Sequence, residues 1–133
     1  MRIATYTAVA VLAAVAGASA VAAPSTVPHS LVGCWHRNVP AGGGGIPGIW
    51  HIWIRPSGAF AAANPSSQKC NGYQDFSGHI TVSNSTLTIG PLPVCSGSAS
   101  YTWTANATTM MLHHKKDGCP IRIRLFEGTW KKG

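Results

Sequence analysis

The chain has 133 residues, of which 45% are hydrophobic and only 10% charged, and a formal net charge of +7. A composition rich in Thr, Ile, Val and Trp is expected to fold, which excludes a disordered secreted tail. The length suits one domain and is too short for two. The basic residues are scattered, so nucleic acid is not an expected partner, whereas an anionic cell-envelope component suits the positive charge.

The first 23 residues read as a cleavable secretory signal. Arg2 supplies the positive start, residues 8–16 are almost wholly apolar, and small residues follow at positions 18, 19, 20, 22 and 23. The apolar run is too short and too rich in alanine to span about 30 Å of hydrocarbon, and no transmembrane span is expected. The sequence therefore predicts a secreted protein whose mature charge is one unit lower, since Arg2 is lost.

Residues 24–30 are expected to form an exposed leader before a single domain at residues 31–133. The stretch LVGC, ending at Cys34, also matches the sequence around a lipidated bacterial cysteine. However, two prolines and a histidine separate it from the apolar run, and lipidation of Cys34 would leave Cys70 without a partner. Release as a free secreted protein is therefore favoured over anchoring at Cys34.

Short segments of alternating hydrophobicity, with turn signals roughly every 8 to 12 residues, predict about eight antiparallel strands. The clearest strand spans residues 48–55, with Trp50, Ile52 and Ile54 on one face. The expected strands cover residues 31–37, 48–55, 59–63, 73–82, 87–89, 99–104, 109–114 and 121–126. No segment has a helical apolar period, so the fold class is all-β, a closed barrel or a sandwich.

The four cysteines, an even number in a small exported domain, indicate two disulfides with three possible pairings. A turn at residues 105–107 between two of the expected strands would place Cys95 opposite Gly118 or Cys119. The sequence therefore predicts a Cys95–Cys119 bridge and, by elimination, a Cys34–Cys70 bridge.

The two ends of the domain carry motifs that resemble one family. Gly33-x-Trp35 opens the domain and RIRLFEGTW, residues 122–130, closes it; between them lie Tyr101-Thr102-Trp103 and Asp117-Gly118-Cys119. This arrangement resembles small secreted lipocalin-like domains of actinobacteria. The resemblance implies an up-and-down barrel closed by Gly33 and Trp35, with Arg122 or Arg124 of the last strand packed on the indole. Unlike typical lipocalins, the chain is short and is expected to lack a helix before its last strand.

An eight-stranded barrel has an interior that side chains fill or that holds one small ligand, and the sequence leaves both outcomes open. The expected ligand-binding residues of the calyx are Trp50, Phe60, Tyr101, Trp103 and Met110. The small side chains of Ala61, Ala62 and Ala63 indicate spare room.

No catalytic or metal site is expected. The three carboxylates Asp75, Asp117 and Glu127 form no pair at short spacing, and all four thiols are assigned to disulfides. His113 and His114 are adjacent in an expected strand, so their side chains should lie on opposite faces and cannot share one metal ion. No cofactor is expected either.

These observations predict a secreted, non-enzymatic barrel that binds a small apolar ligand or an anionic cell-envelope component. The alternative is a secreted protein-binding module such as a protease inhibitor, which would act through the leader at residues 24–30 or the glycine-rich loop at residues 42–45. The sequence gives no indication of the oligomeric state.

Overall fold

The computed structural model describes residues 17, 27–42, 47–64, 70 and 74–133. The predicted signal segment lies outside these residues except for Gly17, and the glycine-rich loop lies outside them except for Gly42. The strands are β1 (Gly33–Val39), β2 (Gly48–Ile54), β3 (Ala59–Ala63), β4 (Phe76–Ser83), β5 (Thr86–Ile89), β6 (Ala99–Ala105), β7 (Thr109–Lys116) and β8 (Gly128–Lys132). A 3-10 turn, η1 (His29–Leu31), precedes β1, and a helix, α1 (Pro120–Phe126), precedes β8.

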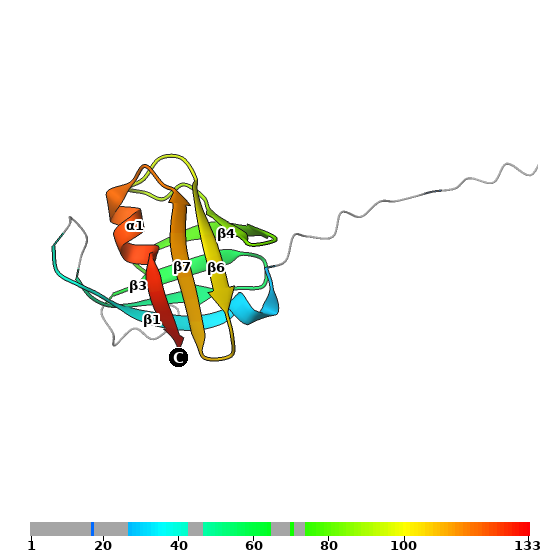
Figure 1. Cartoon of the computed structure of the whole chain (residues 1–133), viewed down its shortest axis with the longest axis horizontal. Coiled ribbons are helices and arrows are strands. Elements are labelled where there is room, and N and C mark those ends of the chain that lie inside the picture. Colours follow the sequence, from blue (N-terminus) through cyan, green and yellow to red (C-terminus); the bar gives the residue numbers. More distant parts are fainter. Residues whose placement is uncertain (1–16, 18–26, 43–46, 65–69, 71–73) are drawn as a thin grey trace, which may run out of the picture.

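The eight strands form a closed antiparallel barrel in which each strand pairs with the next along the chain (Figure 1). Closure comes from β1, which pairs with both β2 and β8. Trp35 lies opposite Ile52 on β2 and opposite Lys132 on β8. The prediction of an all-β, up-and-down barrel of eight short strands is confirmed.

The segment before the last strand differs from the prediction. Residues 121–126 were expected to form a strand, but they form most of α1, and the strand that closes the barrel begins only at Gly128. Pro120 occupies the first turn, where its fixed φ suits a helix and its missing N–H costs nothing. Seven residues are too few for a helical period to stand out from alternation. The helix that the chain was expected to lack is therefore present.

Only residues 27–30 of the predicted leader are among those that the structure describes, and they are not all exposed. His29 and Ser30 are exposed, but Val27 retains only 7% of its accessible surface and belongs to the hydrophobic core. Its N–H donates to the carbonyl of Pro56 at 3.1 Å. The prediction of an exposed leader is wrong at Val27, because this side chain adds apolar contact to the barrel.

Both predicted disulfides are confirmed. Cys34 is bonded to Cys70 with a Cα–Cα distance of 6.0 Å, and Cys95 is bonded to Cys119 with a Cα–Cα distance of 5.9 Å. Two bridges in so small a domain indicate an oxidising compartment. In the part of the chain that the structure describes, no helix is long and apolar enough to cross a bilayer.

Candidate ligand-binding site

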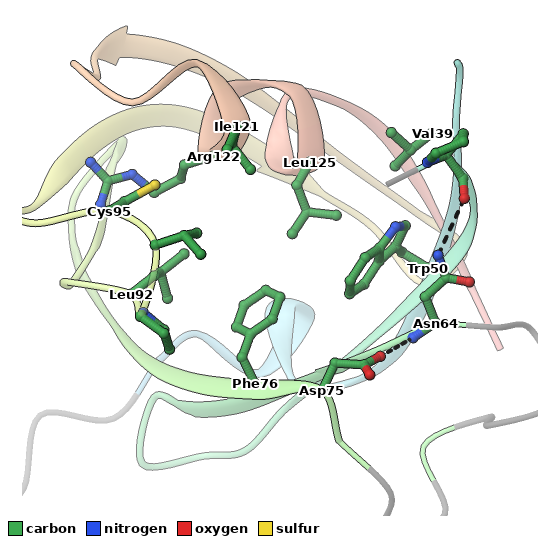
Figure 2. Close-up of a pocket in the computed structure, with 13 residues that line it drawn as sticks. Val39, Trp50, Asn64, Asp75, Phe76, Leu92, Cys95, Ile121, Arg122 and Leu125 are labelled. Carbon is green, nitrogen blue, oxygen red and sulfur yellow. Dashed lines mark hydrogen bonds between the residues drawn. The ribbon is translucent and has the colours of Figure 1, made fainter. Parts of the chain in front are cut away.

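A cavity of about 670 Å³ opens at one end of the barrel, which we call the mouth (Figure 2). At this end β1 and β3 finish, β4 starts and α1 lies beside the strands. The lining is mostly apolar and comes from Val39, Pro47, Trp50, Asn64, Asp75, Phe76, Leu92, Pro93, Val94, Cys95, Ile121, Arg122 and Leu125. It combines strand ends with one loop and one helix.

The opposite end of the barrel is sealed by tryptophan. Trp35 is fully buried, and its indole N–H donates to the carbonyl of Leu31 in η1 at 2.9 Å. Trp130 is also fully buried and donates to the carbonyl of Phe126 at 2.9 Å. Because both indole N–H groups are satisfied, these large rings fill this end without leaving a polar group unpaired.

A column of aromatic rings separates the sealed end from the mouth. Trp130 and Phe126 have ring centroids 6.4 Å apart, and Phe126 and Phe60 follow at 5.7 Å. Phe60 then contacts Phe76 at 6.3 Å, and Phe76 contacts Trp50 at 5.9 Å. The column ends at Phe76 and Trp50, both of which line the cavity. These stacked rings therefore fill the part of the interior that lies behind the cavity.

Helix α1 forms one wall of the cavity and is anchored from β1. Arg37 Nη1 donates to the carbonyls of Arg124 and Leu125, both at 2.8 Å, and so satisfies two acceptors at the C-terminal end of the helix. Arg124 Nη2 donates in turn to the carbonyls of Pro40 and Ala41 at 2.8 and 2.7 Å. Burial lowers the pKa of Arg37, and the charge of Arg124 lowers it further. Both guanidinium groups therefore hold the helix in place.

A second wall is a tight loop beside the helix, to which a disulfide connects it. Leu92 and Cys95 exchange two backbone hydrogen bonds of 3.0 and 3.1 Å. Cys95 is bonded to Cys119, the residue that caps the N-terminus of α1. The Cys95–Cys119 bridge thus joins the two walls of the cavity covalently.

A buried ion pair lies behind these walls. Arg122 Nε donates to both carboxylate oxygens of Asp117 at 3.1 and 2.9 Å, and Nη2 donates to Oδ1 at 2.8 Å. Arg122 Nη1 donates to the carbonyl of Gly97 at 2.8 Å. Asp117 also accepts from the Tyr101 hydroxyl at 2.6 Å and from the Cys119 N–H at 2.9 Å. Every charged group of the pair is therefore satisfied inside the protein.

The ionisation of this network follows from its contacts. Burial by itself would raise the pKa of Asp117, but hydrogen bonds from Arg122, Tyr101 and the Cys119 N–H, with the charge of Arg122, outweigh it and hold the pKa below its usual value. Burial raises the pKa of Tyr101, as does its hydrogen bond to Asp117. Although Arg122 contributes to the cavity lining, its charge is neutralised by Asp117.

Only one of the five predicted calyx residues lies at the cavity. Trp50 lines it, whereas Phe60, Tyr101 and Met110 are buried in the filled interior. Trp103 is half-buried, and its indole N–H donates to the carbonyl of Asn84 in the turn between β4 and β5. Period-two alternation identifies inward side chains but not their height along the barrel axis. The cavity residues on the Leu92 loop carried no strand pattern that could reveal them, and those on α1 were assigned to a strand that the structure replaces with a helix.

The basic residue that packs on the Trp35 indole differs from the prediction. Gly33 and Trp35 lie at the sealed end, but the cation over the indole is Lys132, whose Nζ lies 4.4 Å from the ring centroid. Arg122 and Arg124 belong to α1 and contact Asp117 and backbone carbonyls instead. The correction follows from the position of the last strand, since β8 ends at Lys132.

The two adjacent histidines meet at one carboxylate. His114 Nδ1 contacts Glu127 Oε2, and His113 Nδ1 lies 3.4 Å from Oε1 of the same residue. Their ring centroids are 5.5 Å apart, so the two side chains approach each other at Glu127 although they are adjacent in β7 and were expected to lie on opposite faces. The register shift in the β6–β7 pairing lies after these residues, because His113 and His114 pair in regular register with Thr102 and Tyr101. Within the described residues, no group of three or more metal-ligating side chains has a geometry that could hold an ion.

Comparisons with protein-family models, curated proteins and solved structures found no match for this chain. Its class therefore rests on its own geometry. It is a disulfide-bridged, closed antiparallel β-barrel of eight strands, sealed at one end and hollowed at the other.

Proposed function

We propose that the protein is a secreted, lipocalin-like binding protein that holds a small apolar ligand in the mouth cavity and carries out no chemistry on it. The observation that carries the proposal is the cavity itself. Its volume of about 670 Å³ lies within the range of about 300–1,000 Å³ typical of small-molecule sites, and its lining is mostly apolar with few polar groups.

The construction of the barrel supports binding from one side only. The aromatic column gives the cavity a rigid floor, while α1 and the Leu92 loop form walls that the Cys95–Cys119 bridge holds together. A preformed cavity reduces the ordering cost of binding. Each Å² of apolar ligand surface removed from water contributes about 25 cal/mol.

The carboxylates favour binding over catalysis. Asp117 is neutralised by Arg122, and Glu127 contacts the two histidines. Asp75 lines the cavity without either of the other carboxylates, so the paired acid and base that hydrolysis of a glycoside requires are not brought together.

Secretion and the lipocalin-like class are parts of the same proposal. An apolar segment after Arg2 and two disulfides support export. A closed eight-stranded barrel with a helix before its last strand supports the resemblance. The alternative of a protein-binding module acting through the leader has less support, because Val27 packs into the core.

The proposal is tested by titrating the oxidised protein with the neutral fluorescent probe N-phenyl-1-naphthylamine. Ile121→Trp places a larger side chain in the cavity at a position that is already 40% exposed. Met111→Trp is the matched control, because Met111 is 52% exposed on β7 and does not line the cavity.

We expect saturable binding of one probe per chain, weakened at least about tenfold by Ile121→Trp and unchanged by Met111→Trp. Each tenfold loss corresponds to about 1.4 kcal/mol. Failure of the unmodified protein to bind the probe would contradict the proposal, as would equal affinities for the two variants.

A further inference from the structure

Exposed apolar side chains gather beside the opening of the cavity. Val94 keeps 68% of its accessible surface, the largest fraction among the exposed large hydrophobic residues of the described chain, and Ile121 keeps 40%. Both residues line the cavity. Three exposed prolines lie close to them in the chain, namely Pro91, Pro93 and Pro120. We call these five residues the mouth patch. Exposed apolar residues that cluster in this way mark an interaction surface.

The two segments of the mouth patch are held together covalently. Val94 directly precedes Cys95, and Ile121 lies shortly after Cys119, so the bridge between the two cysteines places both apolar side chains at the same side of the mouth. Leu92 and Cys95 exchange backbone hydrogen bonds of 3.0 and 3.1 Å, which fix the turn that carries Val94. The patch is therefore presented to a partner without a reordering of the chain.

The charges around the mouth patch suit an anionic surface. Residues 89–99 and 118–121 contain no charged side chain, so covering the patch removes no charge from water. Lys116, the last residue of β7, is exposed, and Arg124 is partly exposed on α1. Neither of them forms an ion pair with a carboxylate of the described residues. An apolar centre with basic residues nearby is typical of proteins that bind the surface of an anionic membrane.

The acidic residues do not oppose this arrangement. Asp117 is enclosed with Arg122 and has no accessible side-chain surface. Glu127 contacts the two adjacent histidines. Asp75 also lines the cavity, but Figure 2 shows it on the side away from Leu92. The mouth patch itself therefore carries no carboxylate that an anionic surface would repel.

We propose that the mouth patch docks the protein on a lipid bilayer that contains anionic phospholipid, with Val94 and Ile121 among the head groups and Lys116 and Arg124 near the lipid phosphates. In this orientation the mouth faces the bilayer, and an apolar ligand passes between the lipid and the cavity without crossing water. The passage of a ligand rests on the proposed function, whereas the docking rests on the patch.

A second copy of the chain is the alternative occupant of the mouth patch. Each copy carries ten Lys and Arg against three Asp and Glu, so two copies that meet at their mouths repel each other. Such a contact would also close both cavities. A bilayer with anionic phospholipid supplies the opposite charge and dissolves apolar molecules. The observations therefore favour the bilayer.

The test is co-sedimentation with vesicles of the oxidised protein, recovered from the culture medium. One set of vesicles contains equal parts of phosphatidylglycerol and phosphatidylcholine, and the other contains phosphatidylcholine alone. Val94→Asp and Ile121→Asp place a charge in the mouth patch. Met111→Asp is the matched control, because Met111 is 52% exposed on β7 and does not line the cavity. Lys116→Glu is compared with Lys131→Glu, which changes an exposed lysine near the end of β8.

We expect the unmodified protein to bind the anionic vesicles about tenfold more tightly than the neutral ones. Val94→Asp and Ile121→Asp should each weaken this binding about tenfold, whereas Met111→Asp should leave it within about twofold. Lys116→Glu should weaken it more than Lys131→Glu. Absence of vesicle binding, or equal losses for Val94→Asp and Met111→Asp, would overturn the docking. A lipid-free oligomer that Val94→Asp dissociates would overturn it in favour of a second copy.

A gain of binding provides a second test that does not depend on a lost interaction. Because Trp favours the membrane interface, Val94→Trp should strengthen binding to the anionic vesicles about threefold, and Met111→Trp should not. Unchanged binding by Val94→Trp would also count against the docking. Titration with N-phenyl-1-naphthylamine without vesicles keeps the two proposals apart. A protein that binds the probe but no vesicles lacks the docking alone, and one that binds vesicles but no probe lacks the ligand-binding function.

Discussion

Arg122 and Asp117 form an ion pair that is almost fully enclosed, with 1% and 0% of their side-chain surfaces accessible. The pair connects α1 to the segment after β7, and its remaining hydrogen bonds reach Tyr101 on β6 and the carbonyl of Gly97. It thus joins the helical wall of the cavity to the barrel. Its energetic contribution depends on whether both charges are present.

Removal of one partner should be costly. Either Arg122→Met or Asp117→Asn leaves the other group buried without its counter-charge, and we expect the free energy of unfolding to fall by about 3–5 kcal/mol. The double variant should lose less than the sum of the two single changes, since no uncompensated charge remains. Urea denaturation measures all three, with the exposed Lys116→Gln as a control expected within about 0.5 kcal/mol. Additive single effects would contradict this account.

Acidification should destabilise the barrel through Asp117. Because the folded-state pKa of Asp117 lies below its usual value, its contribution to stability is present above the unfolded pKa of about 3.9 and is lost as the pH falls through the folded pKa. We expect the melting temperature of the unmodified protein to fall steeply below about pH 4. Asp117→Asn should show a shallower acid dependence, although it starts from a lower melting temperature. Parallel curves for the two proteins would show that Asp117 is not responsible.

Both disulfides should stabilise the fold, but only one of them should affect ligand binding. They close loops with sequence separations of 36 and 24 residues, so removal of either, as a Cys→Ser pair, should cost about 2–4 kcal/mol. Only the Cys95–Cys119 bridge joins two walls of the cavity, and its removal should also weaken binding of N-phenyl-1-naphthylamine. The Cys34→Ser, Cys70→Ser variant is the matched control and should bind the probe normally at a temperature where it remains folded. Equal losses of affinity would mean that the Cys95–Cys119 bridge has no special role at the mouth.

The stability of the sealed end should depend on the absence of a side chain at position 33. Gly33 has a φ of +128°, and a Cβ there would lie 2.5 Å from Lys132 Nζ and 2.9 Å from its Cε. Lys132 would have to leave the Trp35 ring and the carbonyl of Val32, which its Nζ contacts at 2.6 Å. We expect Gly33→Ala to lower the free energy of unfolding by about 1–3 kcal/mol, through backbone strain and the displaced lysine.

Introducing Gly33→Ala into a Lys132→Met protein distinguishes the contribution of backbone strain from that of the displaced lysine. The strain at position 33 persists in this variant, whereas the displaced cation no longer matters, so Gly33→Ala should cost less there than in the unmodified protein. Thermal unfolding followed by the fluorescence of the buried tryptophans provides the measurement. An unchanged melting temperature for Gly33→Ala would contradict the close approach of Lys132.

Much of the barrel could be predicted from local patterns. The alternation of Trp50, Ile52 and Ile54 identified β2, and the turn between β6 and β7 placed Cys95 opposite Cys119. These inferences hold because strand period and hairpin register depend on neighbouring residues. The same reasoning failed at residues 121–126, where a seven-residue helix contains too few residues to show its own period.

The candidate site could not be predicted in the same way. Trp50 and Tyr101 both point inward, yet one lines the cavity and the other is buried behind it, because position along the barrel axis depends on how all eight strands are staggered. The meeting of His113 and His114 at Glu127 likewise depends on where β8 begins, because Glu127 directly precedes that strand.

The sequence by itself determined the all-β class, the antiparallel strands and both disulfides, because each follows from the period of a strand, the geometry of a hairpin or the number of cysteines. Only the tertiary structure decided which end of the barrel is filled. It placed an aromatic column from Trp130 to Trp50, put Lys132 over Trp35, and left Asp75 at the rim of an apolar cavity. Those outcomes depend on contacts between residues far apart in the chain, which come together only when β8 closes against β1.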